Sequence, residues 1–201
     1  MKNILKKIHH YRWYLLWFAA LLILLVYLAV NRESRGRLAD LFIDDTKYSA
    51  EIKAAAKKHG LPPELVRAVV RKESGFDHGA EGKAGEIGLM QILPDGAVAD
   101  WARINNRPKP AELDLFDAEL NLDIGCWYLG RALRKWQKYR HGTELALAEY
   151  NAGAKNSNRW KPETFNGKVV ERIDFPVTRN YVQVIMKNYR KYCAESKSLA
   201  R

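Results

Sequence analysis

One acidic residue stands where the helical pattern of its segment predicts a buried position. The segment "PELVRAVVRKESGF", residues 63–76, carries four apolar residues at helical spacing: Leu65, Val66, Val69 and Val70. At about 100° per residue these four side chains form one face, and Glu73 falls near its centre. Because burial disfavours the charged form of a carboxyl group, we expect a raised pKa at Glu73, which suits a general acid near neutral pH. The alternative is a structural Glu that bonds to backbone groups or to a basic side chain.

The elements that would position Glu73 are predicted to be helices. Apolar residues recur at helical spacing in segments 48–60, 61–74, 118–139, 144–153 and 178–193. No segment shows sustained two-residue alternation, which would indicate a strand. We therefore expect an all-α domain, in which the Gly-rich connection at 75–88 leaves room for a small β excursion.

Composition and charge restrict the class of protein and of partner. The chain has 201 residues, enough for one domain of ordinary size, and a net charge of +11. A basic surface suits an anionic partner such as nucleic acid, a membrane surface or a cell-wall polymer, although solvated Lys and Arg explain the charge equally well. No basic helix or aromatic stacking motif supports nucleic-acid binding.

The His and Cys residues show no metal-ligand spacing, so we expect no metal and no cofactor. Cys126 and Cys193 could pair in an oxidising compartment, but two unpaired thiols are the favoured interpretation.

The N-terminal part of the sequence has the length and composition of a membrane span. Residues 13–30, "WYLLWFAALLILLVYLAV", are 18 consecutive apolar residues. A helix of this length reaches about 27 Å, close to the thickness of the hydrocarbon core of a bilayer. A cleaved signal peptide is the competing interpretation, but no A-x-A-like cleavage site follows. We therefore expect residues 1–30 to form a cytoplasmic basic tail and a transmembrane signal-anchor, and residues 31–47 to form a juxtamembrane connector.

Four blocks of the sequence resemble, in order, those of the soluble-lytic-transglycosylase-type (SLT) catalytic domain, a family related to goose-type lysozyme. They are "ESGFDHGAEGKAGEIGLMQILP" at 73–94, "DLFDAELNLDIGCWYL" at 114–129, "ALAEYNAG" at 146–153 and "TRNYVQVIMKNY" at 178–189. Trp160 matches a Trp that commonly follows the third block. The resemblance covers residues 48–192, so we expect this range to be the catalytic domain and 193–201 to be a C-terminal tail. It implies a lysozyme-like α-helical fold with a long glycan cleft.

The resemblance also implies an activity, the lytic cleavage of peptidoglycan with Glu73 as sole catalytic acid and base. Glu73 would protonate the oxygen of the β-1,4 bond between N-acetylmuramic acid (MurNAc) and N-acetylglucosamine (GlcNAc). The C6 hydroxyl of MurNAc would then attack its own C1, and the product would be a 1,6-anhydro sugar. Further implied roles are that Gln91 hydrogen-bonds sugar, that the Tyr150 hydroxyl lies near the catalytic carboxylate, and that Met90 and Tyr181 line the cleft.

The apolar span at 13–30 and the implied substrate together predict a location. The protein would be a single-pass protein of the bacterial inner membrane, with its catalytic domain on the periplasmic side, where the glycan strands lie. The sequence names no protein partner.

Two positions depart from the family pattern and leave alternatives open. Gly82 stands where many members have Ser, and Val177 stands where a Glu often precedes the last block. A hydrolase would need a second carboxylate, as nucleophile or to activate water. Glu86 and Glu149 are acids beside the motifs, and we expect both to be solvated. The alternatives are a hydrolytic muramidase on the same fold and a catalytically silent peptidoglycan-binding module of an envelope complex.

Overall fold

The chain divides into two units, which are described separately. The computed structural model describes residues 2–30 and 43–199. The first unit comprises residues 1–43 and the second comprises residues 44–201.

The first unit contains one long helix, α1 (Lys2–Val30). Within the described ranges, no helix combines the length and the apolar character needed to cross a membrane, so the transmembrane span expected at 13–30 is not found. Residues 31–42 of the expected connector at 31–47 lie outside the described residues.

The second unit is built from helices, as the sequence pattern predicts. Its α-helices are α3 (Ser49–His59), α4 (Pro63–Glu73), α5 (Ala99–Ile104), α6 (Ala118–Trp136), α7 (Gly142–Trp160) and α8 (Pro176–Leu199). Three short turns of other helix types join them: η1 (Pro94–Val98), η2 (Glu112–Phe116) and η3 (Val170–Arg172). Among residues 43–199 the only β structure is a pair of isolated bridges, in which Ile87 faces both Glu81 and Ile92. The prediction of an all-α domain with a small β excursion is therefore confirmed.

Local chemistry explains where the helix that carries Glu73 begins and ends. Pro63 occupies the first helical turn of α4, where its missing N–H costs nothing. The preceding helix, α3, stops at Gly60, which adopts a left-handed conformation with φ 70°. At the other end Gly75 has φ 61°, so the chain turns sharply just after Glu73. The carboxyl group therefore lies at the C-terminal end of α4.

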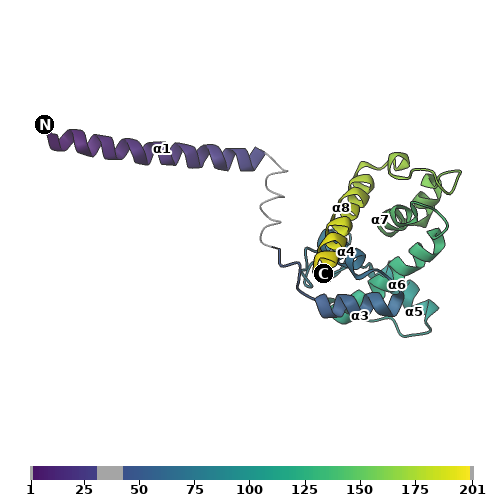
Figure 1. The fold of residues 1–201 in the computed structure, drawn as a ribbon. Coiled ribbons are helices and arrows are strands. Elements are labelled where there is room, and N and C mark those ends of the chain that lie inside the picture. The colour runs from purple at the N-terminus through teal and green to yellow at the C-terminus, as the bar shows by residue number, and fades with distance from the viewer. Residues whose placement is uncertain (1, 31–42, 200–201) are drawn as a thin grey trace. The chain divides into compact units, whose positions relative to one another are not determined.

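Helix packing brings separate sequence blocks together. Helix α4 packs against α8, and α6 packs against both α3 and α7; Figure 1 shows α8, drawn in yellow, beside α4. Apolar side chains fill the contacts between these helices, among them Leu65, Val69, Leu122, Leu129, Leu147, Val182 and Ile185. Because α4 and α8 lie side by side, side chains of the last sequence block can reach the end of α4.

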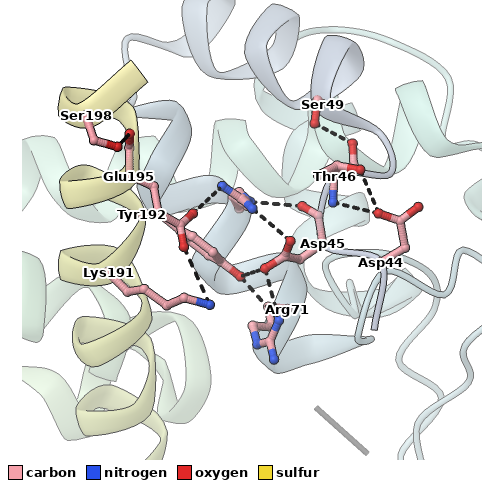
Figure 2. A network of polar contacts seen from close by, with 10 residues as sticks. Asp44, Asp45, Thr46, Ser49, Arg71, Lys191, Tyr192, Glu195 and Ser198 are labelled. Carbon is pink, nitrogen blue, oxygen red and sulfur yellow. Dashed lines mark hydrogen bonds and ion pairs between the residues drawn. The ribbon is translucent and has the colours of Figure 1, made fainter. Parts of the chain in front are cut away.

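A polar cluster fixes the first residues of this unit to α4 and α8 (Figure 2). Asp45 accepts hydrogen bonds from Arg67 Nη2 at 2.8 Å, from Arg71 Nη1 at 3.2 Å and from the Tyr192 hydroxyl at 3.0 Å. The Arg67 guanidinium also lies over the ring of Tyr192, 3.8 Å from its centre. The packed unit thus includes residues just before 48, where the sequence pattern placed its start. At the other end α8 continues through Leu199, past the boundary expected at 192.

Candidate active site

The Glu73 carboxylate is half-buried and is held by a tyrosine from α8. The Tyr181 hydroxyl donates a hydrogen bond of 2.5 Å to Glu73 Oε1. Tyr181 is itself buried, with 3% of its surface exposed. The next residue, Ser74, donates through its Oγ to the Leu89 carbonyl at 3.0 Å and so ties the end of α4 to the following loop. The carboxylate therefore has one fixed donor and a fixed backbone.

Burial gives Glu73 the pKa of a general acid that works near neutral pH. Removal of the carboxylate from water raises its pKa from 4.5 to about 7. The hydrogen bond from Tyr181 and the charge of Lys72 act in the opposite direction, and the negative charge of Glu86 adds to the rise. A group with a pKa near 7 can give up a proton and take one back at neutral pH.

The loop that faces Glu73 is shaped by one buried amide on α6. Asn121 is fully buried, and its Oδ1 accepts a hydrogen bond from Met90 N at 2.9 Å. Its Nδ2 donates to the carbonyls of Ile87 and Leu115, at 2.9 and 2.8 Å. Gly88 lies against this amide with φ 76°, and a Cβ there would come within 2.3 Å of Asn121 Nδ2. The amide of Asn121, in the block at 114–129, therefore fixes the backbone of residues 87–90, in the block at 73–94.

Met90 is a packing residue in this structure. Its side chain is fully buried, and a Cβ on Gly125 would lie 2.5 Å from its sulfur. Gly125 therefore allows α6 to approach the loop closely. The Met90 carbonyl accepts a hydrogen bond of 2.8 Å from the Tyr150 hydroxyl. A place for Met90 in the wall of the cleft stays a prediction.

Gln91 is held in place by the same loop. Its backbone is left-handed, with φ 47°. Its Nε2 donates to the carbonyls of Ala80 and Gly88, both at 3.0 Å. These bonds leave Oε1 as the end of the amide that could accept a hydrogen bond from a sugar hydroxyl.

Two tyrosines near Glu73 make different hydrogen bonds. The Tyr150 hydroxyl, expected near the catalytic carboxylate, donates to the Met90 carbonyl. Tyr150 remains close enough to Glu73 for the two groups to interact electrostatically. Tyr181 was expected to line the cleft, and it makes the direct bond to Glu73. The helical spacing within 178–193 placed Tyr181 on the inner face of its helix, but spacing alone does not say which residue it meets.

The two other acids near the motifs have different surroundings. Glu149 Oε2 accepts hydrogen bonds from Lys135, Trp136 and Ser157, at 2.7, 2.8 and 2.8 Å. With three donors on one oxygen, Glu149 has a structural role, and the expectation that it is solvated is wrong. Glu86 is half-buried and borders a cleft of about 500 Å³ whose walls include Leu93, Pro94 and Phe116.

The remaining motif residues stabilise the fold around the site. Asn151 Oδ1 accepts a hydrogen bond of 2.8 Å from Thr178, which joins α7 to α8. Trp160 is buried, and its indole N–H donates to Asp174 at 2.7 Å. Cys126 and Cys193 are both free thiols; Cys126 is buried and Cys193 is half-buried.

Comparison with known proteins identifies the family. The model of the transglycosylase SLT domain matches residues 50–172. The chain therefore belongs to this family, and the match includes Glu73, the loop that faces it and the Asn121 helix.

The relatives are lytic transglycosylases that are longer than this chain. One from Haemophilus influenzae is 33% identical over 144 residues, which are 69% of this chain and 23% of the relative. Membrane-bound lytic murein transglycosylase C of Actinobacillus succinogenes is 33% identical over 113 residues, 54% of this chain and 32% of the relative. The chain thus spans about a quarter to a third of the length of these relatives.

A solved structure supports the same grouping. An inactive Glu-to-Gln mutant of lytic transglycosylase Slt from Pseudomonas aeruginosa is similar with a TM-score of 0.68 and 27% identity. The similarity covers 79% of this chain and 25% of that protein.

Proposed function

We propose that this protein is a lytic transglycosylase that cleaves the β-1,4 bond between MurNAc and GlcNAc in peptidoglycan. The observation that carries the proposal is the state of Glu73, a half-buried carboxyl group with one tyrosine donor and a pKa of about 7. Membership of the SLT family supports peptidoglycan as the substrate.

The proposed reaction has two proton transfers, and Glu73 performs both. Protonated Glu73 gives its proton to the glycosidic oxygen, the C1–O bond breaks, and positive charge develops at C1 of MurNAc. The C6 hydroxyl oxygen of the same sugar bonds to C1, and ionised Glu73 takes the hydroxyl proton. No water is consumed, and the enzyme returns to its starting state. The Tyr181 hydroxyl stabilises the ionised form between the two transfers.

Residues around Glu73 are proposed to hold the glycan. Gln91 Oε1 is suited to accept a hydrogen bond from a sugar, because its Nε2 is already bonded to the loop. Tyr150 is proposed to act through the loop, since its hydroxyl bonds to the Met90 carbonyl next to Gln91.

A hydrolytic muramidase on the same fold is the second candidate. It would need a carboxylate beside Glu73 to activate water. Glu86 is the acid whose charge acts on Glu73, whereas Glu149 is bonded to three donors. The two candidates differ in product, since hydrolysis leaves a reducing MurNAc end.

The assignment of Glu73 is tested by digestion of purified sacculi with the full chain. Glu73→Gln keeps the size of the side chain and removes the acid, so we expect a folded protein that is at least about 10²-fold slower. Glu81→Gln is the matched control, because Glu81 is an exposed acid of the facing loop. Digestion by Glu73→Gln at the wild-type rate would show that the assignment is wrong.

We also propose that the enzyme works in the cell envelope and that residues 13–30 attach it to the inner membrane, with the catalytic domain at 48–192 on the periplasmic side. The described large apolar side chains of α1 between Trp13 and Tyr27 are at least half exposed, which suits contact with lipid. Fractionation should place the full chain with the membranes, and a chain without residues 1–30 in the soluble fraction. A full chain that stays soluble would contradict this attachment.

A further inference from the structure

Two oxygen atoms, one from Glu86 and one from Gln91, share the space above Gly82. A Cβ on Gly82 would lie 2.1 Å from Glu86 Oε2 and 2.9 Å from Gln91 Oε1. The φ of Gly82 lies outside the left-handed region, so its backbone conformation would accept a side chain. The glycine is therefore needed for space, because a side chain at 82 would exclude the Glu86 carboxylate from this place.

Hydrogen bonds hold both oxygens where they are. Glu86 Oε2 accepts a hydrogen bond of 3.0 Å from the Ala84 N–H, and the Glu86 carbonyl accepts one of 2.7 Å from the Gly82 N–H. Gln91 Nε2 donates to two loop carbonyls, both at 3.0 Å, which turns Oε1 toward Gly82. The two acceptors are thus fixed side by side by the loop itself.

Both side chains can be reached from outside. Glu86 and Gln91 are half-buried, and Glu86 borders the cleft of about 500 Å³. Among the described residues no donor bonds to Gln91 Oε1, and no buried side-chain oxygen is left without a donor, so Gln91 Oε1 is open to solvent. A ligand in the cleft can therefore approach the pair.

The chemistry of the pair selects the kind of group that it can bind. An amide oxygen and a carboxylate are both acceptors, so the matching group is a donor, such as a sugar hydroxyl or the N–H of an N-acetyl group. A hydrogen bond to a carboxylate is roughly twice as strong as one between neutral groups. Two acceptors side by side suit two donors of one sugar ring.

We propose that Glu86, seated over Gly82, binds the glycan directly and that, together with Gln91, it accepts hydrogen bonds from donor groups of one sugar in the cleft. This inference rests on the proposed function and adds a substrate contact to it. Glu86 takes no part in either proton transfer. Position 82 decides whether the contact exists, because glycine admits the carboxylate and a side chain displaces it.

A binding experiment tests the contact without cleavage. The probe is N-acetylchitotetraose, a GlcNAc oligomer without stem peptide, titrated by calorimetry into the full chain carrying Glu73→Gln. Glu86→Ala and Gly82→Ala, each added to this background, should weaken binding roughly tenfold, because each removes the same charge-assisted hydrogen bond. The two changes combined should weaken binding no further than either one alone. Glu163→Gln is the control, since Glu163 is exposed and lies outside the lining of this cleft.

Kinetics with catalytically intact Glu73 provide a second readout. On glycan strands freed of stem peptides, Glu86→Ala should raise KM roughly tenfold and leave kcat within about threefold, because the contact is present both in the bound substrate and in the transition state. Glu86→Gln keeps a neutral acceptor in the same place, so its KM should lie between those of wild type and Glu86→Ala.

The outcomes separate this inference from the proposed function. Wild-type affinity for chitotetraose in both Glu86→Ala and Gly82→Ala would overturn the contact. Weaker binding of peptide-bearing strands alone would overturn its assignment to a sugar. A loss in Glu86→Ala without one in Gly82→Ala would overturn the part assigned to Gly82. Weaker chitotetraose binding in both variants of a protein that cleaves no glycan would support the site and refute the proposed function.

Discussion

A carboxylic acid that first gives up a proton and then takes one back works best when its pKa lies near the working pH. Four influences set the pKa of Glu73: burial and the charge of Glu86 raise it, and the Tyr181 hydrogen bond and the charge of Lys72 lower it. Burial was predictable, because Glu73 falls within the apolar arc of its helix. The Tyr181 bond was not, since Tyr181 lies 108 positions further along the chain and a helical pattern does not specify the partner of a face.

At the residue scale, removal of the Tyr181 hydroxyl should affect both rate and pH profile. In Tyr181→Phe the ionised form of Glu73 loses its donor, so the pKa of Glu73 should rise further. The alkaline limb of kcat should therefore move to higher pH. The maximal rate should fall roughly tenfold, the cost of a hydrogen bond to a charged group. A limb that moves to lower pH would contradict the role of this bond.

At the element scale, the helices were predictable from the sequence, whereas the breaks within them and the contacts that hold those breaks were not. The segment 144–153 was expected to end at Gly153, and Gly153 does leave the helical conformation, with φ 82° and ψ 162°. The chain then resumes its helical course as far as Trp160. The bond between Asn151 and Thr178 holds this joint against α8, and such a tertiary contact has no signature in local spacing.

The ion pairs and hydrogen bonds of Asp45 with α4 and α8 should make the stability of the fold depend on pH. Burial alone would raise the pKa of Asp45, but hydrogen bonds from Arg67 and Tyr192 and the charges of Arg67 and Arg71 outweigh it, and the pKa is lowered. A lowered pKa means that the carboxylate stabilises the fold above its unfolded pKa of about 3.9, and that this stability is lost as the pH falls through the folded pKa.

Asp45→Asn should therefore destabilise the protein at pH 7 by about 1–3 kcal/mol, since Asp45 is only partly buried. The melting temperature should fall by roughly 2–4 °C for each kcal/mol. The difference from wild type should shrink in melting curves recorded below about pH 4. Asp44→Asn is the control, because Asp44 is exposed and its carboxylate accepts hydrogen bonds from its near neighbours Thr46 and Lys47. An equal loss at pH 3 and pH 7 would contradict the ionic role of Asp45.

At the scale of the whole molecule, the ordered blocks of sequence predicted the family, which the family match confirms, and the helical patterns predicted the fold class, which the observed helices confirm. The reason is physical: Asn121 reaches across to the loop of residues 87–90, and Gly125 makes room for Met90, so the spacing of these blocks is fixed by contact. The prediction of a transmembrane span rests on the apolar residues at 13–30 and on no tertiary contact. The described part of the chain contains no helix that is long and apolar enough to cross a membrane.

The central claim is that one carboxylate performs both proton transfers and that no water enters the reaction. It is tested most directly by mass spectrometry of the muropeptides released when the full chain digests sacculi. An internal C6 hydroxyl held at C1 has a large entropic advantage over free water, so the products should end in 1,6-anhydro-MurNAc, each one water lighter than the hydrolytic product. Products that end mainly in reducing MurNAc would contradict the account and identify a hydrolase in which a second carboxylate directs water.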